Sequence, residues 1–354
     1  MTPPGSAAGP AASSDRAAGV AALPGAIPFA TVREAAAAQG LSALAVLSPP
    51  PDRLDPAGLE QMIADGLGDL GWIAESRELR LHPTALWPGT RSLLVAAWDY
   101  QTEAGDGALR RARYAAGKEY HVRLRLALQR TGETLAPDAR HRAVVDSAPL
   151  NERTLAQRAG LGWIGRNALV IAPDAGSFRF LGVLLTTATL APHHAGHGAD
   201  RCGSCTACET RCPTAALTGR RCLTERCISY LTIEHQGVIP RALAERFQGW
   251  WFGCDLCQEV CPWNRFAQGP ADPRLAGSED DARLLAVTAA DFDQVFAGRA
   301  IRRLGYGRFR RNLLVALFSL GRRDMARAIA ADDLPLVRDQ ARELGLAPLR
   351  TGPS

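Results

Sequence analysis

Nine cysteines, all between positions 202 and 261, are the residues of this 354-residue chain whose spacing most clearly indicates chemistry. The first run reads CGSCTACETRCP at residues 202–213, and the second reads CDLCQEVCPW at residues 254–263. Closely spaced cysteines followed by a cysteine just before proline are typical of the ligands of four-iron, four-sulfur clusters. The second run ends in the same way but has one cysteine fewer. The sequence therefore predicts two [4Fe-4S] clusters, with one ligand from outside the two runs.

The pairing of ligands follows from the same spacing, because the cysteine before proline ligates the opposite cluster in paired runs of this kind. Cys222 and Cys227 lie between the runs, and either could supply the missing thiolate. The expected ligands of one cluster are Cys202, Cys205, Cys208 and Cys261. Those of the other are Cys212, Cys254, Cys257 and one of Cys222 or Cys227.

Two other uses of these cysteines compete with iron–sulfur chemistry. Zinc knuckles also use pairs of cysteines separated by two residues, but they need neither a third cysteine in phase nor a proline after the last one. A disulfide scaffold would require an oxidising compartment, and the sequence shows no signal peptide. The spacing therefore favours iron–sulfur clusters.

The composition is that of an ordinary globular protein, with 47% hydrophobic and 22% charged residues. The chain is long enough for two or three domains. Its longest apolar run, residues 181–191, contains three threonines and is too short to span a bilayer. We therefore expect a cytoplasmic protein with no membrane association, and a monomer.

Positive charge is concentrated at the carboxyl end. The formal net charge is +5, and residues 299–354 contain twelve Arg against five Asp and Glu. Guanidinium groups bind phosphates in a bidentate manner, so a nucleic-acid partner is plausible. A genomic bias toward Ala and Arg codons would give the same composition, and charge alone does not separate the two explanations.

The elements that must position these residues follow from local patterns. Residues 1–27 are rich in Ala, Gly, Pro and Ser and are expected to be a disordered extension. Helices are predicted over residues 28–40 and 56–70, the second capped by Asp55, and residues 92–98 are predicted to form a buried strand. A basic helix is predicted over residues 110–130.

The next predicted strand, residues 143–145, ends at Asp146, and strand ends commonly present catalytic groups. A helix is predicted over residues 151–159, followed by a glycine-rich break at 160–165. Residues 168–172 and 178–187 are predicted to form a hairpin. A pair of helices at 309–320 and 334–346 cannot bury its own apolar face, so we expect it to pack on the cysteine-rich part.

Five segments together resemble the epoxyqueuosine reductase family, over residues of about 28–345. They are GKEYH (117–121), VDSAPLNER (145–153), QRAGLGWIGRN (157–167), CISYLTIE (227–234) and FGCDLCQEVCPWN (252–264). The resemblance implies an oxidoreductase that uses cobalamin and two clusters to reduce epoxyqueuosine at the wobble position of tRNA to queuosine. Its partners would be the modified tRNA and an external one-electron donor.

The resemblance also implies an α+β fold in four parts. Residues 1–27 would be the extension, 28–195 a cobalamin-binding catalytic domain of α/β type, 196–270 a two-cluster ferredoxin-type domain, and 271–354 a short HEAT-like helical region. The family pattern selects Cys227 as the eighth cluster ligand and leaves Cys222 free.

By the same resemblance, Asp146 is the proton donor to the departing oxygen. Such a donor needs a raised pKa, so we expect Asp146 to be desolvated; the alternative is that it caps the following helix. The implied cobalamin contacts are Arg153, Trp163, Arg166, Asn167 and Ser229. Arg153 could instead pair with Glu152, and Trp163 could belong to the core.

Two functions of other classes remain open from the sequence. The chain could be an electron-transfer ferredoxin with a large structural partner domain, although this would leave about two hundred residues before the cysteines without a role. It could also be a reductive dehalogenase-like enzyme acting on a small molecule. Salt-dependent tRNA binding distinguishes the predicted enzyme from the second alternative.

Overall fold

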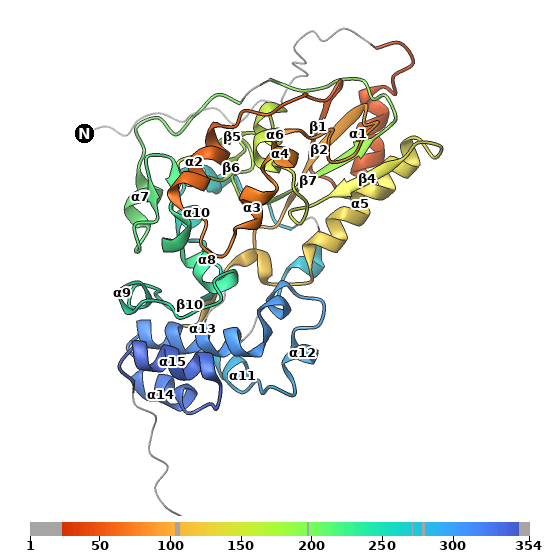
Figure 1. Cartoon of the computed structure of the whole chain (residues 1–354). Coiled ribbons are helices and arrows are strands. Elements are labelled where there is room, and N and C mark those ends of the chain that lie inside the picture. The colour runs from red at the N-terminus through yellow and green to blue at the C-terminus, as the bar shows by residue number, and fades with distance from the viewer. Residues whose placement is uncertain (1–22, 103–106, 197, 271, 278–279, 347–354) are drawn as a thin grey trace, which may run out of the picture.

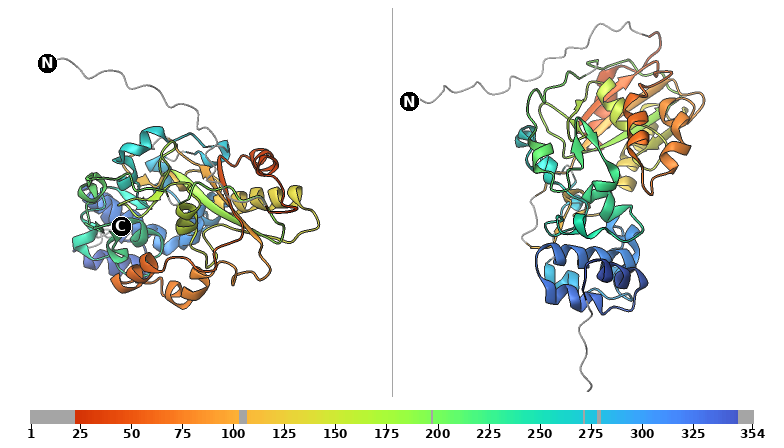
Figure 2. Two further views of the ribbon diagram at one scale, coloured as in Figure 1. Left: turned by 90° about the horizontal axis from the view of Figure 1, so that it is seen from above. Right: turned by 60° about the vertical axis from the view of Figure 1, so that its left-hand side comes forward.

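The computed structural model describes residues 23–102, 107–196, 198–270, 272–277 and 280–346. The chain combines a sheet with flanking helices, a cysteine-rich segment and a group of carboxyl-terminal helices (Figure 1). In Figure 2, right, the sheet and the carboxyl-terminal helices lie at opposite ends, with much of the cysteine-rich segment between them. Among the described residues, no helix is both long and apolar enough to cross a membrane.

The central sheet has four strands in the order β1-β2-β7-β4, and every neighbouring pair is antiparallel. The strands are β1 (Ala43–Leu47), β2 (Ser92–Asp99), β7 (Arg179–Thr186) and β4 (His141–Val144). Strand β2 is buried along its whole length, as its apolar sequence predicts. Strand β4 lies at the edge of the sheet and leads directly into Asp146.

Helices cover both faces of this sheet. Helix α1 (Phe29–Ala37) and helix α5 (Tyr120–Leu135) pack on one face through Val32, Leu124 and Leu128, all fully buried. Helix α6 (Glu152–Arg158) packs on the other face. Because alternate residues of a strand point to opposite faces, β2 contributes to both apolar clusters. The two ends that flank Asp146, β4 and α6, are therefore both anchored in the core.

Three short helices complete this half of the chain. Helix α2 (Ala57–Asp65) ends before Gly66 and is shorter than the predicted helix, but Asp55 does accept a hydrogen bond from the Ala57 N–H at 3.0 Å. It is followed by α3 (Trp72–Glu75) and α4 (Arg77–Leu81). These helices form a small apolar cluster of their own through Leu59, Ile73 and Leu81.

The predicted disorder of residues 1–27 lies mostly outside the described residues. Its last part is wrong, because Ile27 bridges to Leu190 in the structure. The Ile27 N–H donates to the Thr189 carbonyl at 2.9 Å, and the Ile27 carbonyl accepts from the Ala191 N–H at 2.8 Å. Backbone pairing with a distant segment is not visible in local composition, so composition alone does not show that Ile27 belongs to the folded part.

Two predicted elements differ from the structure. Arg110–Arg111 form a short strand, β3, that pairs in parallel with β10 (Trp250–Phe252), and a 3-10 turn at Arg113–Ala115 separates β3 from α5. The basic helix predicted to begin at residue 110 therefore begins only at Tyr120, ten residues later. The predicted hairpin is also wrong, since β6 (Val170–Ile171) pairs with β5 (Trp163–Ile164) and not with β7. Only its turn is present, with mutual hydrogen bonds between Ala172 and Gly176.

The cysteine-rich segment contains only short elements. They are α7 (Ala207–Arg211), β8 (Leu217–Thr218), β9 (Arg221–Cys222), a 3-10 turn at Thr224–Arg226, α8 (Ile228–Ile233), α9 (Arg241–Ala244), β10, α10 (Leu256–Glu259) and a 3-10 turn at Pro262–Phe266. Helices α7 and α10, one from each cysteine run, lie in contact.

The carboxyl-terminal helices share one core with the cysteine-rich segment. They are α11 (Asp281–Leu285), α12 (Phe292–Val295), α13 (Gly305–Ser319), α14 (Arg323–Ala330) and α15 (Pro335–Glu343), with 3-10 turns at Pro273–Leu275 and Ala300–Leu304. Helix α13 is central, and its Phe309 packs edge-on against Trp251. The prediction that these helices pack on the cysteine-rich part is confirmed.

Candidate active site

Asp146 lies just beyond the end of β4, in a backbone conformation that few side chains adopt. Its φ angle is 54°, in the left-handed region, where Asp is tolerated better than most residues. The Asp146 Oδ2 atom accepts a hydrogen bond from the Tyr120 hydroxyl at 3.2 Å and lies 3.0 Å from the His121 Nε2 atom. Both partners come from the first turn of α5. The fold thus brings the end of one strand against the start of a helix.

His121 lies between two carboxylates. Its Nδ1 atom contacts Glu119, and its Nε2 atom contacts Asp146. Burial would lower the pKa of His121, but the hydrogen bonds and negative charges of Asp146 and Glu119 outweigh burial and raise this pKa to about 9. His121 is therefore an imidazolium at neutral pH, and both of its ring nitrogens act as donors.

The same contact lowers the pKa of Asp146. The largest cause is the hydrogen bond from His121, which outweighs the effect of burial, and Tyr120 and the charge of Arg303 lower it further. The sequence-based expectation of a raised pKa for Asp146 is therefore wrong. The Asp146 side chain is 64% exposed, and a cation lies against it. In this conformation the proton of the pair is on His121.

The helix-capping alternative for Asp146 is also wrong. The residue that caps α6 is Asn151, whose side-chain oxygen accepts from the Thr154 N–H at 3.3 Å. The Asp146 carboxylate instead faces α5. Its position at a strand end, with no structural hydrogen bond to α6 from its side chain, leaves the carboxylate available for chemistry.

Aromatic stacking fixes the direction of the His121 ring. The Tyr120 ring stacks on Phe180 of β7 with centroids 3.8 Å apart and on His121 with centroids 4.0 Å apart. Stacked rings restrict rotation about χ2 and add to the energy of simple burial. Phe180 is a core residue of the sheet, so the sheet fixes the Tyr120 ring, and the Tyr120 ring in turn fixes the His121 ring.

Arg153 and Arg80 extend the site on the side of α6. Arg153 Nη1 donates to the Ala168 carbonyl at 2.8 Å. Burial lowers the pKa of Arg80, while the charges of Glu152 and Asp146 raise it and that of Arg153 lowers it. The Arg153 charge also reaches Cys222, where it opposes the rise in the thiol pKa caused by the hydrogen bond with Cys227 and by burial. Asp146 and the second group of cysteines therefore face a common region.

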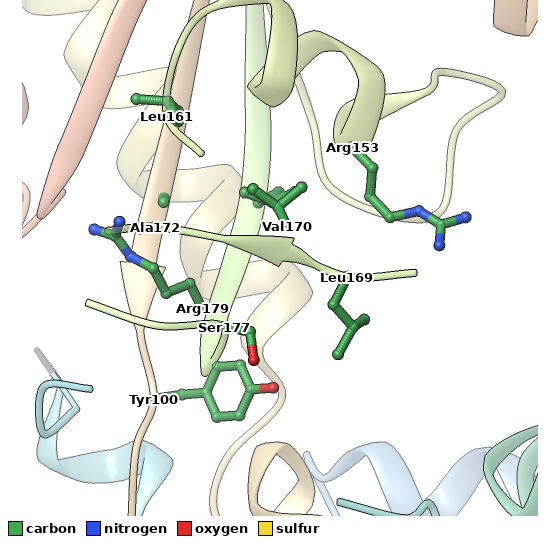
Figure 3. Close-up of a pocket in the computed structure, with 10 residues that line it drawn as sticks. Tyr100, Arg153, Leu161, Leu169, Val170, Ala172, Ser177 and Arg179 are labelled. Carbon is green, nitrogen blue, oxygen red and sulfur yellow. The ribbon is translucent and has the colours of Figure 1, made fainter. Parts of the chain in front are cut away.

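A small cavity opens beside Arg153 (Figure 3). Its volume is about 80 Å³, and it lies between the sheet and the β5–β6 ribbon. Its lining is mostly apolar, with polar groups from Tyr100, Ser177, Arg153 and Arg179. Figure 3 shows Arg153 and Arg179 extending in opposite directions from this region.

The nine cysteines form no disulfides, and their mutual electrostatic effects favour two groups, although Cys257 of the second group also interacts with Cys208 of the first. Burial and then the charges of Cys202 and Cys205 raise the pKa of Cys261. Burial and the charge of Cys202 likewise raise the pKa of Cys208. These four thiols come from both runs, as the crossed assignment of the first cluster requires.

The second group surrounds Cys227. Burial raises the pKa of Cys254 and of Cys257, and the charge of Cys227 raises each further. Cys257 also interacts with Cys212. A hydrogen bond from Cys222 lowers the pKa of Cys227, so these two thiols are neighbours. The assignment of Cys227 over Cys222 as the eighth ligand stays a prediction.

The surroundings of the thiols suit thiolate ligands of iron–sulfur clusters, which commonly accept hydrogen bonds at sulfur. Trp163 Nε1 donates to Cys202 Sγ at 3.4 Å, and the Ala216 N–H donates to Cys212 Sγ at 3.3 Å. Within the described residues, no three side chains of His, Cys, Asp or Glu converge closely enough to share one metal ion.

The other predicted cofactor residues fall in two places. Trp163 is 1% exposed and contacts Cys202, while Arg166 donates to the Gly203 carbonyl at 3.1 Å, so both lie against the first cysteine run. Ser229 lies in α8, and its backbone N–H contributes to the hydrogen bonding that lowers the pKa of Cys227. Asn167 is buried, and its Nδ2 atom has no hydrogen-bond partner among the described residues.

Sequence reasoning did not identify four members of the site: Glu119, Tyr120, His121 and Glu152. Three of them belong to the GKEYH segment, which was recognised as a motif without a role for any residue. The signal was a His and a Tyr at the amino end of a helix, but their partner Asp146 lies 25 residues beyond His121. Only the fold brings them together.

Two groups of thiols beside an acid–base network define an iron–sulfur oxidoreductase. Comparisons with known proteins agree. Residues 201–264 match the family model of a 4Fe-4S double cluster binding domain, and residues 80–147 match that of epoxyqueuosine reductase QueG. The first match contains all eight of the proposed cluster ligands, and it also contains Cys222.

Full-length relatives identify the family. Epoxyqueuosine reductase of Xanthomonas campestris is 39% identical over 313 residues, which cover 80% of this chain and 86% of the relative. That of Escherichia coli is 39% identical, covering 71% of this chain and 70% of the relative. The chain belongs to the epoxyqueuosine reductase family. The predicted family and the prediction of an oxidoreductase are confirmed.

Solved structures share the fold. An epoxyqueuosine reductase with a tRNA-Tyr epoxyqueuosine-modified stem loop superposes with a TM-score of 0.75 at 26% identity, covering 90% of this chain and 89% of that one. The enzyme from Bacillus subtilis gives a TM-score of 0.75 at 26% identity and covers 88% of each chain. In that structure, a catalytic loop named for its aspartate is swung out of the active site.

Proposed function

We propose that this chain reduces epoxyqueuosine in tRNA to queuosine, with the Asp146–His121 pair as its proton source. The observation that carries the proposal is the hydrogen-bonded contact of Asp146 with His121 and Tyr120, beside a double set of cluster thiols, in a member of this family. Conversion of the epoxide to the alkene consumes two electrons and two protons and releases water. A site for this reaction therefore needs an electron supply and an acid.

The two clusters provide the electron supply. Each cluster transfers one electron at a time, and an external one-electron donor would reduce them. The first cluster, near the exposed Cys205, would accept electrons, and the second, near Cys227, would deliver them. The position of Arg153 supports this order of electron transfer. Its charge acts on Cys222, the neighbour of Cys227, and also on Arg80, which interacts with Asp146, so the second cluster is the one on the Asp146 side.

Cobalamin fits the region between the second cluster and Asp146. When bound, it supplies a cobalt centre that can carry the two electrons required by the epoxide. The buried, unpartnered Nδ2 atom of Asn167 suits a ligand rich in amide oxygens, while the cavity beside Arg153 has room for a peripheral group of such a ligand only. We propose Arg153 and Asn167 as direct contacts. Ser229, Trp163 and Arg166 would border the cofactor from the cysteine-rich side.

The acid is the Asp146–His121 pair rather than Asp146 alone. Since Asp146 is the exposed member, its carboxyl oxygen is the group that reaches substrate, and His121 holds the proton until it is needed. A short proton shift from Nε2 to Oδ2 makes Asp146 the donor of one proton to the departing oxygen, and the second proton of the released water comes from solvent. Tyr120 holds the carboxylate during this step through its hydroxyl.

In this proposal the chain has the domains that the sequence predicts. Residues 28–195 would bind cobalamin and hold the acid, 196–270 would bind the clusters, and 271–354 would be a short HEAT-like region that contacts tRNA. The shared core of the last two parts supports a rigid connection between electron supply and RNA contact. Partly exposed arginines such as Arg338 and Arg342 are candidates for phosphate contacts.

The test is anaerobic turnover of epoxyqueuosine-containing tRNA by protein with both clusters assembled, with and without added cobalamin. Conversion to queuosine that depends on cobalamin is the expected result. If no conversion occurs while both clusters are intact and reducible, the proposed function is wrong, and small halogenated or epoxide substrates become the ones to test.

A further inference from the structure

The backbone at Asp146 forms a tight three-residue turn. The Ser147 N–H donates to the Val145 carbonyl at 2.5 Å across Asp146, whose φ angle is 54°. Turns with a positive φ at the central residue are strained for any residue with a Cβ atom. This turn decides the direction of the catalytic carboxylate, so something outside the turn must hold it in place.

Glu152 makes that contact. Its Oε1 atom accepts a hydrogen bond from the Asp146 backbone N–H at 2.8 Å. Glu152 is the first residue of α6, which Asn151 caps and which Leu155 and Ala156 anchor in the core with no exposed surface. The acceptor is therefore attached to a fixed element, whereas the donor belongs to the loop between β4 and α6.

The charges around Glu152 are few. Burial is the main cause that raises the pKa of Glu152 to about 7, and the negative charge of Asp146 raises it further, while Arg80 and the hydrogen bond from Asp146 lower it. Arg80 comes from α4, Asp146 from the loop, and Arg153 is the next residue of α6. Hydrogen bonds to a carboxylate are stronger than those to a neutral acceptor, so this contact strengthens as Glu152 loses its proton.

We propose that Glu152 is a positioning residue that holds the Asp146 turn in its catalytic conformation. Glu152 acts on the backbone of Asp146 and not on substrate. The inference rests on the proposed role of the Asp146–His121 pair. Without the contact, the turn relaxes toward ordinary φ values, and the carboxylate leaves the His121 and Tyr120 donors. A misplacement of about 1 Å in a catalytic group lowers a rate by roughly 100-fold.

The test compares Glu152→Ala, which removes the acceptor, with Glu152→Gln, which keeps an oxygen at the same place. Turnover of the modified tRNA is measured with protein that carries both clusters and added cobalamin. We expect kcat of Glu152→Ala to fall roughly 10- to 100-fold with an unchanged KM for tRNA, and Glu152→Gln to restore most of the loss. Glu133→Ala, an exposed site on α5, is the matched control.

A pH profile separates positioning from simple loss of stability. The wild-type rate should rise as the pH is raised through about 7, and this rise should be absent from Glu152→Gln. Wild-type kcat in Glu152→Ala, or a rise that persists in Glu152→Gln, would overturn the inference. If Asp146→Asn also keeps wild-type activity, the proposed acid is at fault; if Asp146→Asn is inactive while Glu152→Ala is active, only the positioning role fails.

Discussion

Replacement of His121 by glutamine is the sharpest test of the acid proposed here. Glutamine keeps a polar side chain at this position but cannot carry the proton that His121 holds between Glu119 and Asp146. The His121 pKa is about 9 against an ordinary value of 6.5, so at pH 7.5 nearly all of the wild-type enzyme holds the proton. Without His121, the pair becomes a single Asp146 carboxyl, which at this pH is almost entirely ionised.

The magnitude follows from the protonated fraction. A carboxyl that titrates near pH 4 is protonated in only about one molecule in three thousand at pH 7.5, and general acid catalysis contributes roughly 100- to 10,000-fold in enzymes. We therefore expect kcat of His121→Gln to fall roughly 100- to 1,000-fold, and the rate to recover partly as the pH is lowered. His82→Gln, a half-exposed histidine of the α4 end, is the control.

The assay is the rate of queuosine formation between pH 6 and pH 10, with iron content and cobalamin binding measured for each variant.

The free energy of unfolding gives an independent check, because the direction of its change with pH follows from the pKa of His121. Because the folded-state pKa of His121 is raised, its contribution is fully present below pH 6.5 and is lost as the pH rises through about 9. At about 1.4 kcal/mol per pKa unit, the shift from 6.5 to about 9 corresponds to at most about 3.5 kcal/mol. Wild-type activity in His121→Gln, or an unchanged high-pH limb, would refute the reasoning.

Three further predictions concern the rest of the chain. Cys222→Ser should keep about eight iron atoms per chain and Cys227→Ser about four; equal iron in the two variants would contradict the choice of Cys227. Arg338→Ala combined with Arg342→Ala should weaken tRNA binding and reduce its salt dependence by about one unit of slope for each phosphate that the variant no longer binds; an unchanged slope would place the RNA elsewhere. Arg311→Ala should lower the free energy of unfolding by about 3–5 kcal/mol, since the buried Arg311 guanidinium donates to the Leu231, His235 and Gly237 carbonyls; Arg327→Ala, at the surface, should change it by less than about 0.5 kcal/mol.

Arginine substitutions test tRNA binding better than a truncation, because the carboxyl-terminal helices are part of the core of the cysteine-rich segment. Removal of all residues after Gly298 would test the role of the Arg-rich end in tRNA binding only if the remainder folded. Phe309 and Leu313 of α13 are fully buried in the core that also contains Trp251. Deleting them would expose the apolar side of the cysteine-rich segment, so a weaker tRNA affinity of the truncated chain would report unfolding as much as the removal of RNA-binding arginines.

Local sequence was sufficient for features that depend on neighbours along the chain. The spacing of the cysteines predicted two groups of thiols, and the structure places thiols of both runs in each group. The helix predicted over residues 151–159 and the strand at 92–98 were also predictable, because helical and buried apolar patterns are local, whereas the cap of the helix, for which Asp146 was the candidate, lies at Asn151. The pairing of the strand at Val170–Ile171 was not predictable, since strand pairing depends on which other strand lies beside it in the fold.

The chemistry of the site shows the same division. The sequence by itself indicated some of the groups that can react: nine cysteines with the spacing of cluster ligands and an aspartate at a predicted strand end, but no role for His121. Only the tertiary structure decided the protonation of Asp146, because the charge that lowers its pKa belongs to His121, 25 residues earlier. Electrostatic effects depend on distance in space, and a sequence does not contain that distance until the chain has folded.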